Sequence, residues 1–193
     1  MIGVRYASLE ILEADFRELS LRLKMPGGTE LPILEKCISA VRDAVSCKAC
    51  IAELDVRISG STVFIGDDFS VESANLAKNL SGCTRVCIMA VTLGAGVDML
   101  LRKKSAVSPS EHFVCDAVAS AFAERAADLA EKYFMGDTPR RPRFSPGYGD
   151  LPLEIQRDVL RMCDAGRLLG INLTETNLMI PTKSITAMIG KCE

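Results

Sequence analysis

The chain contains few of the residues on which several kinds of site depend. Its 193 residues include no tryptophan and one histidine, His112. A single histidine excludes a multi-histidine metal centre within the chain, because every such ligand needs its own imidazole. His112 falls just inside a predicted helix start, so we expect it to be an ordinary residue of a helix surface.

A strong charge of one sign and long apolar runs are also lacking. The 23 Lys and Arg residues nearly balance the 25 Asp and Glu residues, which leaves a net charge of −2. This balance argues against a dedicated nucleic-acid or membrane-surface role. No apolar run reaches the ~18 residues of a spanning helix, and Met1–Tyr6 lacks the basic start of a signal peptide. We therefore expect a cytoplasmic protein that binds neither nucleic acid nor a membrane.

Eight cysteines are present, in an arrangement that matches no familiar metal motif. Cys47 and Cys50 form a CxxC pair, and Cys83 and Cys87 form a CxxxC pair. The second pair lacks zinc-ribbon spacing. The first pair ends a predicted helix, whereas a helix dipole activates a thiol at the start of one. We expect reduced structural thiols and no metal, with a metal site or a redox pair as the alternatives.

Hydrophobic periodicity and turn residues predict an α+β (mixed α/β) domain, with a single sheet and helices packed on it. Leucines at near-helical spacing predict an N-terminal helical segment at residues 1–30, followed by the main domain at residues 31–193. The last two strands are expected to pair with each other. The first expected helix of this domain begins at Pro32, and further helices are expected over 70–80, with Ser70 as N-cap, 97–103, 108–134 and 153–169. The expected strands are 51–58, 62–65, 85–92, 178–180 and 184–189.

The composition changes between Met135 and Asp150, where proline, glycine and three arginines replace the apolar pattern. Loops of this length inside compact domains are usually functional or disordered. Arginine offers a planar fork for a carboxylate or phosphate, and Tyr148 is suited to cover an apolar or cationic surface. Residue chemistry alone leaves two interpretations, an anion-binding loop or a surface turn with solvated arginines.

Three blocks of this half of the chain occur in a recognisable order. They are Asp116–Glu124 with the form Asp-x-x-Ala-x-Ala-Phe-Ala-Glu, Arg143-Phe144-Ser145-Pro146-Gly147-Tyr148 followed by Pro152, and Gly170–Pro181 with Leu-Thr-Glu and Met-x-Pro, followed by Ser184-Ile185-Thr186. Together they resemble the activation domain of cobalamin-dependent methionine synthase, over residues ~111 to 189. The resemblance implies the fold of that domain.

The resemblance also implies a function. In that family, the domain binds S-adenosylmethionine and docks on the cobalamin module. An electron from a flavodoxin-like donor and a methyl group from S-adenosylmethionine then return inactive cob(II)alamin to methylcobalamin. This chain carries no cobalamin, homocysteine or folate module, so we expect a stand-alone reactivation partner of a synthase that carries the cobalamin. No residue here need be catalytic, because the cofactors supply the reactivity, and the chain is not expected to be a complete enzyme alone.

Residue roles follow from the second block. Arg143 matches the family arginine that is expected to hold the carboxylate of the ligand. Ser145 and Gly147 match backbone positions along the ligand, and Tyr148 matches the adjacent aromatic.

The acidic side of the expected site departs from the family. The position of a family glutamate on the long helix corresponds to Ser120, and Glu124 lies one turn later on the same side. Glu124 is either a substitute carboxylate for the cationic groups of the ligand or a solvated helix residue. A late family tyrosine has no counterpart. Two other functions therefore stay open: an activator of another corrinoid methyltransferase, and an interaction module that keeps the fold without the ligand.

Overall fold

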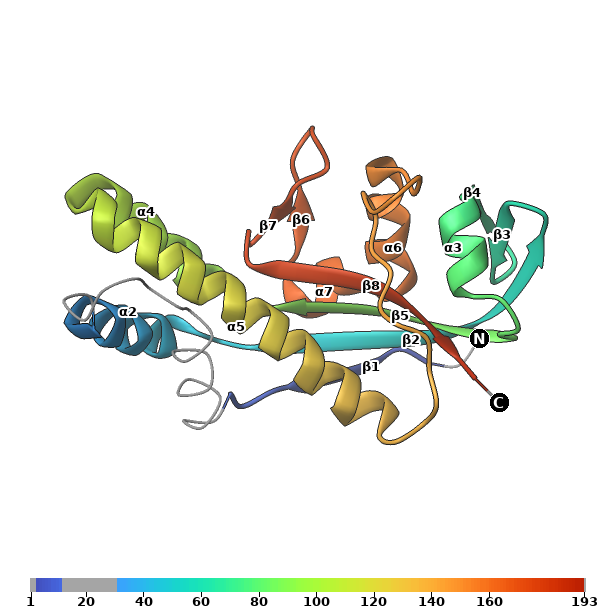
Figure 1. Cartoon of the computed structure of the whole chain (residues 1–193), viewed down its shortest axis with the longest axis horizontal. Helices are drawn as coiled ribbons and strands as arrows, with labels where there is room; N and C mark the ends of the chain where they lie inside the picture. Colours follow the sequence, from blue (N-terminus) through green and yellow to red (C-terminus); the bar gives the residue numbers. More distant parts are fainter. Residues whose placement is uncertain (1–2, 12–30, 193) are drawn as a thin grey trace.

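The structure is a computed structural model that describes residues 3–11 and 31–192. It has a central antiparallel sheet with helices on both faces (Figure 1), which confirms the expected mixed α/β class. In chain order the elements are β1 (Arg5–Ser8), α2 (Leu31–Ala44), β2 (Lys48–Ser59), β3 (Thr62–Ile65), β4 (Phe69–Glu72), α3 (Ala74–Asn79), β5 (Arg85–Thr92), α4 (Ala95–Val107), α5 (Pro109–Met135), η1 (Leu153–Ile155), α6 (Gln156–Met162), α7 (Ala165–Leu169), β6 (Asn172–Leu173), β7 (Met179–Ile180) and β8 (Ser184–Lys191).

The main sheet is built around β5, in which every residue but the first is buried. β5 pairs antiparallel with β2 on one side and with β8 on the other, so that Lys48 and Ser184 both lie opposite Thr92. The order across the sheet is β4-β3-β2-β5-β8, and β1 pairs with the first residues of β2. A strand that has neighbours on both edges and helices over both faces has to be apolar throughout, as the run at 85–92 is.

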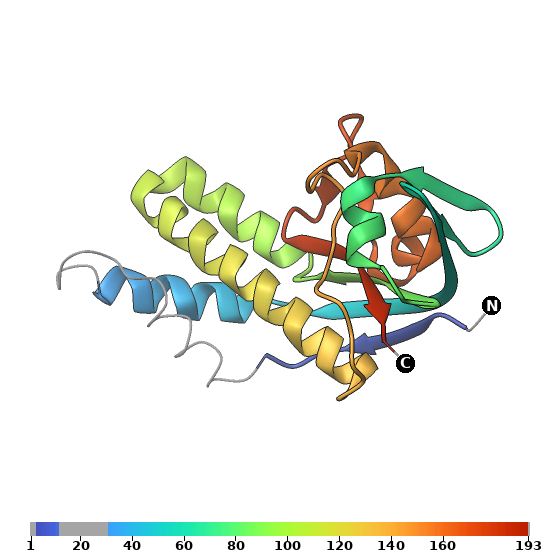
Figure 2. The same cartoon turned by 45° about the vertical axis from the view of Figure 1, so that its right-hand side comes forward.

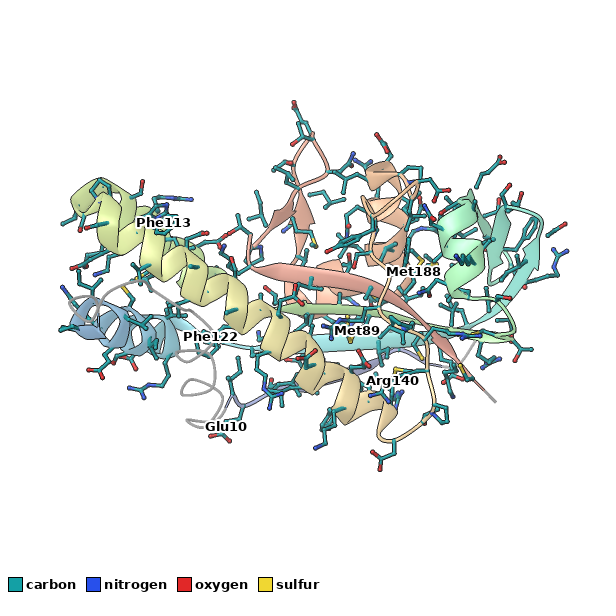
Figure 3. The ribbon with its side chains drawn as sticks, in the orientation of Figure 1. Glu10, Met89, Phe113, Phe122, Arg140 and Met188 are labelled. Atoms are coloured by element: carbon teal, nitrogen blue, oxygen red, sulfur yellow. The ribbon has the colours of Figure 1, made fainter. Side chains whose placement is uncertain are left out.

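Each face of the sheet has its own core. Met89 of β5 and Phe122 of α5 (labelled in Figure 3) belong to the core under α2, α4 and α5. Ile88 belongs to the other core, under α3, α6 and α7, because successive strand residues point to opposite faces. Figures 1 and 2 show that α2, α4 and α5 extend beyond the sheet as a three-helix arm.

Helix α5 is the longest element, and it begins as its capping residues predict. The Ser108 hydroxyl accepts a hydrogen bond from the backbone N–H of Glu111, and Pro109 occupies the first turn. The side toward the sheet carries Phe122 and a series of alanines, which let the helix approach the strands closely. The helix ends at Gly136, whose φ of 56° is costly for other residues.

The helix expected over residues 70–80 begins later than predicted. Ser70 lies in β4, opposite Phe64 of β3, and so is not an N-cap. Ser73 is the N-cap instead, since its hydroxyl accepts a hydrogen bond from Leu76 N at 3.0 Å. Two serines offer the same local cap chemistry, and pairing with β3 decides between them.

The expected pairing of the last two strands is wrong. Met179–Ile180 (β7) pairs with Asn172–Leu173 (β6) in a small separate hairpin, and β8 pairs with β5. The physical reason is burial: the apolar residues of β8 fill both cores beside β5, whereas a polar turn that starts at Thr174 closes the small hairpin. The sheet is thus accompanied by a second, two-stranded one.

Two further expectations need adjustment. The single helix expected over 153–169 is divided into η1, α6 and α7, because Asp164 adopts a left-handed φ of 55° between the last two. Arg5–Ser8 forms β1 rather than part of a helix. The remaining leucine pattern of the predicted N-terminal segment lies outside the described residues, and the division at residue 30 stays a prediction. Among the described residues, no helix is long and apolar enough to cross a membrane.

Candidate functional site

The loop between α5 and η1 runs back along the free edge of β8. Arg141 N donates to Gly190 O at 2.8 Å, and Phe144 and Met188 exchange backbone hydrogen bonds of 3.0 and 2.8 Å. The segment therefore behaves as a short additional strand, which holds Arg143 beside α5 and Ser145 beside β8. This ordered path favours the interpretation of a built site over that of a loose surface turn.

Tight turns shape the second half of the loop. Tyr148 N donates to Ser145 O at 3.1 Å, and Gly147 N donates to Leu151 O at 3.0 Å. Gly147 has a φ of 87°, a conformation that strongly favours glycine. The turn leaves the Tyr148 ring 69% exposed.

Asp150 anchors the end of this turn on α3. Its carboxylate accepts hydrogen bonds from the Ser73 hydroxyl and from the backbone N–H groups of Ala74, at 2.8 Å, and Asn75. These hydrogen bonds, that of Ser73 foremost, hold the pKa of Asp150 below its usual range. A Cβ at neighbouring Gly149 would lie 2.6 Å from Asn75 Nδ2, so a side chain there would require Asn75 to move, and the φ of 58° also favours glycine.

A cavity of about 780 Å³ opens between this loop, α5, η1–α6 and the β7–β8 connection. Its size suits a ligand of cofactor dimensions. Its lining residues are Glu124, Asp128, Glu131, Pro142, Arg143, Ser145, Pro146, Tyr148, Leu153, Gln156, Asn177, Leu178, Met179, Thr182, Ser184, Ile185 and Thr186.

One arginine faces three carboxylates on the α5 side of the cavity. Arg143 Nη1 lies 2.7 Å from Asp128 Oδ1 and 3.3 Å from Glu131 Oε2, and Arg143 Nη2 lies 3.3 Å from Glu124 Oε2. The three acids follow at i, i+4 and i+7, so they share one side of the helix. The lining of this wall holds three carboxylates and Arg143, and Arg140 outside the lining pairs with one of the three, Glu131.

The three carboxylates differ in exposure. The side chain of Glu124 is 67% exposed and that of Asp128 is 51% exposed, whereas that of Glu131 is 18% exposed and also pairs with Arg140. Glu131 therefore belongs to the supporting structure, and the two outer acids face the cavity and solvent. Figure 3 shows Arg140 at the end of α5.

The opposite side of the cavity has a polar floor. The Gln156 amide donates to the Thr186 hydroxyl at 2.8 Å, and both residues are buried. The Ser145 hydroxyl donates to Thr186 O at 2.7 Å. Because these groups are already bonded to one another, they hold the loop against β8 and keep the floor rigid.

Ser120 lies outside the cavity lining. Its hydroxyl accepts a hydrogen bond of 2.9 Å from Lys183 Nζ, which also forms an ion pair of 2.8 Å with Asp116. This cluster fastens the start of β8 to α5 beside the cavity. The structure thus brings Arg143, Ser145, Tyr148 and Glu124 to one cavity, with Gly147 in the adjacent turn, and places Ser120 in the neighbouring cluster.

Sequence reasoning missed Asp128 and Glu131. Their i, i+4, i+7 spacing with Glu124 was available as a signal, but such a stripe more often marks a solvated helix side. Only the return of the loop places an arginine against it. His112, expected on the helix surface, is partly buried, and its Nδ1 lies 3.1 Å from Leu101 O.

Within the described residues, no cysteine belongs to a group of three or more His, Cys, Asp or Glu side chains that could hold a metal ion. Seven of the eight are buried. Burial raises the pKa of Cys47 to about 12 and that of Cys87 to about 11, which disfavours the reactive thiolate.

Comparisons with known proteins bear on the fold. No protein-family model matches the chain, and no curated protein sequence matches it. Among solved structures, the chain is similar to the crystal structure of the MetH reactivation domain bound to AdoHcy, with a TM-score of 0.68. The chain shares the fold of that domain. The two are 14% identical, and the likeness covers 98% of this chain and 78% of that chain.

Proposed function

We propose that the cavity beside Arg143 binds S-adenosylmethionine, and that the chain takes part in the reductive methylation of cob(II)alamin. The observation that carries the proposal is the arginine among carboxylates at the mouth of a cavity of about 780 Å³, in a chain with the fold of a domain that was crystallised with AdoHcy. AdoHcy is what S-adenosylmethionine becomes when it has given up its methyl group.

The charges of the cavity fit those of this ligand. S-adenosylmethionine carries a carboxylate, an ammonium group and a sulfonium group, and so has a net charge of +1. The guanidinium of Arg143 is suited to hold the carboxylate in two parallel hydrogen bonds. Glu124 and Asp128, which lie one helix turn apart, supply negative charge for the ammonium and sulfonium groups.

Binding requires Arg143 to exchange partners. In the structure its guanidinium contacts three carboxylates. The ligand carboxylate replaces one of them, and the released acid then pairs with the cationic end of the ligand. Glu131 stays in place because Arg140 also holds it. The ion pairs thus hold Arg143 in position before the ligand arrives, which reduces the entropy lost on binding.

The turn at Gly147 supplies the remaining contacts in this proposal. Ser145 and Gly147 present backbone groups along the ligand, and the exposed Tyr148 ring covers it. The corrinoid on the partner protein supplies the methyl-accepting metal, and a flavodoxin-like donor supplies the one electron that the reaction consumes. The task of this chain is to hold and orient the methyl donor.

Calorimetric titration of the folded chain with S-adenosylmethionine tests the binding step. We expect a single saturable site. Absence of binding at millimolar ligand, with the fold verified by circular dichroism, would contradict the proposal. That outcome would favour the alternative of a ligand-free interaction module, which the complete internal pairing of Arg143 supports.

A reconstitution experiment tests the partner. A cobalamin-dependent methionine synthase that lacks its own activation domain is brought to the cob(II)alamin state and mixed with the chain, a reduced flavodoxin and S-adenosylmethionine. Conversion to methylcobalamin, followed by visible absorbance, is expected with the chain and not without it. Binding of the ligand without such conversion would point to another corrinoid methyltransferase as the partner.

A further inference from the structure

The cysteines of this chain pair across the fold rather than along the sequence. In each of three pairs, the second thiol lies close enough to raise the pKa of the first. The pairs are Cys50 with Cys163, Cys115 with Cys37, and Cys83 with Cys192. Burial is the larger cause of the raised pKa at Cys83 and Cys115, and the second thiol is the larger cause at Cys50. The CxxC and CxxxC spacings therefore do not define the thiol pairs.

The two cysteines of the CxxxC pair lie on opposite faces of the main sheet. Cys83 belongs to the core under α3 and α6, whereas Cys87 belongs to the core under α5. Cys192 packs against the same core as Cys83. Cys87 is thus excluded as a partner of Cys83, and Cys192 is available.

The position of Gly190 shows how closely Cys83 approaches the end of β8. A Cβ at Gly190 would lie 2.6 Å from Cys83 Sγ. Cys192 follows two residues later, and side chains two apart in an extended strand point to the same face. The sulfur of Cys83 therefore lies over the face of β8 from which the Cys192 side chain projects.

Exposure distinguishes this pair from the other two. All eight cysteines lie in the described part of the chain, and Cys192 is the one that is not buried. Cys37, Cys115, Cys50 and Cys163 are shielded within the cores, so an oxidant in solution does not reach them readily.

We propose that Cys83 and Cys192 form a reversible redox site, which peroxides convert into a disulfide. The partly exposed Cys192 reacts first. Its sulfur attacks one peroxide oxygen, the O–O bond breaks, and one water leaves with the thiol proton, which gives a sulfenic acid at Cys192. The Cys83 sulfur then attacks the Cys192 sulfur, the S–O bond breaks, and the hydroxide leaves as water with the Cys83 proton. Two thiols lose two electrons and two protons, and hydrogen peroxide becomes two waters.

Arg141 links this site to the loop that leads to Arg143. Burial raises the pKa of the Cys83 thiol, and the nearby guanidinium of Arg141 acts against this rise. Arg141 Nη2 also donates a hydrogen bond of 2.7 Å to Ser81 O. Arg141 N donates to Gly190 O, and Cys192 N donates to Pro139 O at 2.9 Å. A disulfide would therefore join the two segments between which the loop is held. It would stabilise the frame of the loop without involving the cavity itself.

Peptide mapping tests the proposal independently of any ligand. The reduced full-length chain is treated with a small excess of hydrogen peroxide, the remaining thiols are alkylated under denaturing conditions, and the digest is analysed by mass spectrometry. We expect a peptide that joins Cys83 to Cys192 and disappears with dithiothreitol, together with loss of both alkylated peptides. Cys47 and Cys87 serve as internal controls and should stay fully alkylated.

The variant Cys192→Ser sharpens the test, since a partly exposed cysteine just outside strand β8 tolerates this change. The oxidised variant should give no internal cross-link, and oxidation should raise the Tm of the original chain and not that of the variant. Over-oxidation of Cys192 with Cys83 left alkylatable would overturn the proposal. So would a cross-link from Cys192 to any other cysteine.

Discussion

Two ion-pair clusters on helix α5, one near each end, have opposite compositions. Near its start, Glu111 stands between two lysines, Lys36 of α2 at 2.6 Å and Lys104 of α4. Near its end, Arg143 stands among three carboxylates of α5 itself. The first cluster holds one acid between two bases, and the second holds one base among three acids.

The difference separates a structural ion pair from a candidate binding site. Glu111 is 19% exposed and its two lysines come from two other helices, so the cluster fastens the three-helix arm together. The outer acids at the other end are more than half exposed, face a cavity, and both pair with the single guanidinium of Arg143. A wall with accessible negative charge favours a cationic ligand. The clusters should respond differently to mutation.

The largest expected effect comes from Arg143→Ala. The affinity for S-adenosylmethionine should fall roughly 10- to 100-fold, because charge-assisted hydrogen bonds contribute about 1.5–3 kcal/mol. Calorimetry measures the change, with Arg161→Ala as the control, since that exposed arginine pairs with Asp158 away from the cavity. An unchanged affinity would reject Arg143 as the carboxylate-binding residue.

A double substitution of the outer acids tests whether their negative charge contributes to recognition of the sulfonium group. In Glu124→Gln/Asp128→Asn, the preference for S-adenosylmethionine over AdoHcy should fall roughly threefold to tenfold. This decrease should be smaller at high salt, because salt screens exposed charges. AdoHcy lacks the sulfonium charge, so the ratio of the two Kd values isolates its recognition. The exposed Glu35→Gln on α2 is the matched control. A constant ratio would show that these acids serve only to hold Arg143.

Glu111→Gln should change stability and leave ligand affinity intact. Hydrogen bonds from Lys104 and Lys36 lower the pKa of Glu111 to about 2 from its ordinary value of 4.5. A depressed carboxyl pKa stabilises the folded state above pH 4.5, and this contribution is lost as the pH falls toward 2. The variant should therefore have a Tm a few degrees lower at pH 7 and approach the original chain at low pH. Thermal unfolding at several pH values measures this, and a Tm difference independent of pH would contradict it.

The smallest effect is expected for Ser120→Ala. Its hydroxyl bonds to Lys183 outside the cavity lining, so the affinity for S-adenosylmethionine should change less than about twofold. A loss comparable to that of Arg143→Ala would mean that Ser120 contacts the ligand after all, and that the outer acids do not replace it.

Sequence reasoning predicted the parts of the fold whose signals are local. The cap at Ser108, the apolar run at 85–92 and the irregular loop after Met135 all appear where expected. It failed at Ser70, where two nearby serines offer the same cap, and at residues 178–189, where strand partners had to be chosen across the chain. In both cases the local sequence is compatible with two structures, and burial beside a particular neighbouring strand determines which of them forms.

The candidate site shows the same division. The sequence by itself determined that Arg143, Gly147 and Tyr148 stand in one turn-rich loop, because proline, glycine and arginine act within a few residues of one another. Only the tertiary structure decided which acids face that arginine and that Cys83 meets Cys192. These contacts join segments that are far apart along the chain. They arise because β8 pairs with β5 and the loop returns beside β8, which brings Arg143 against α5.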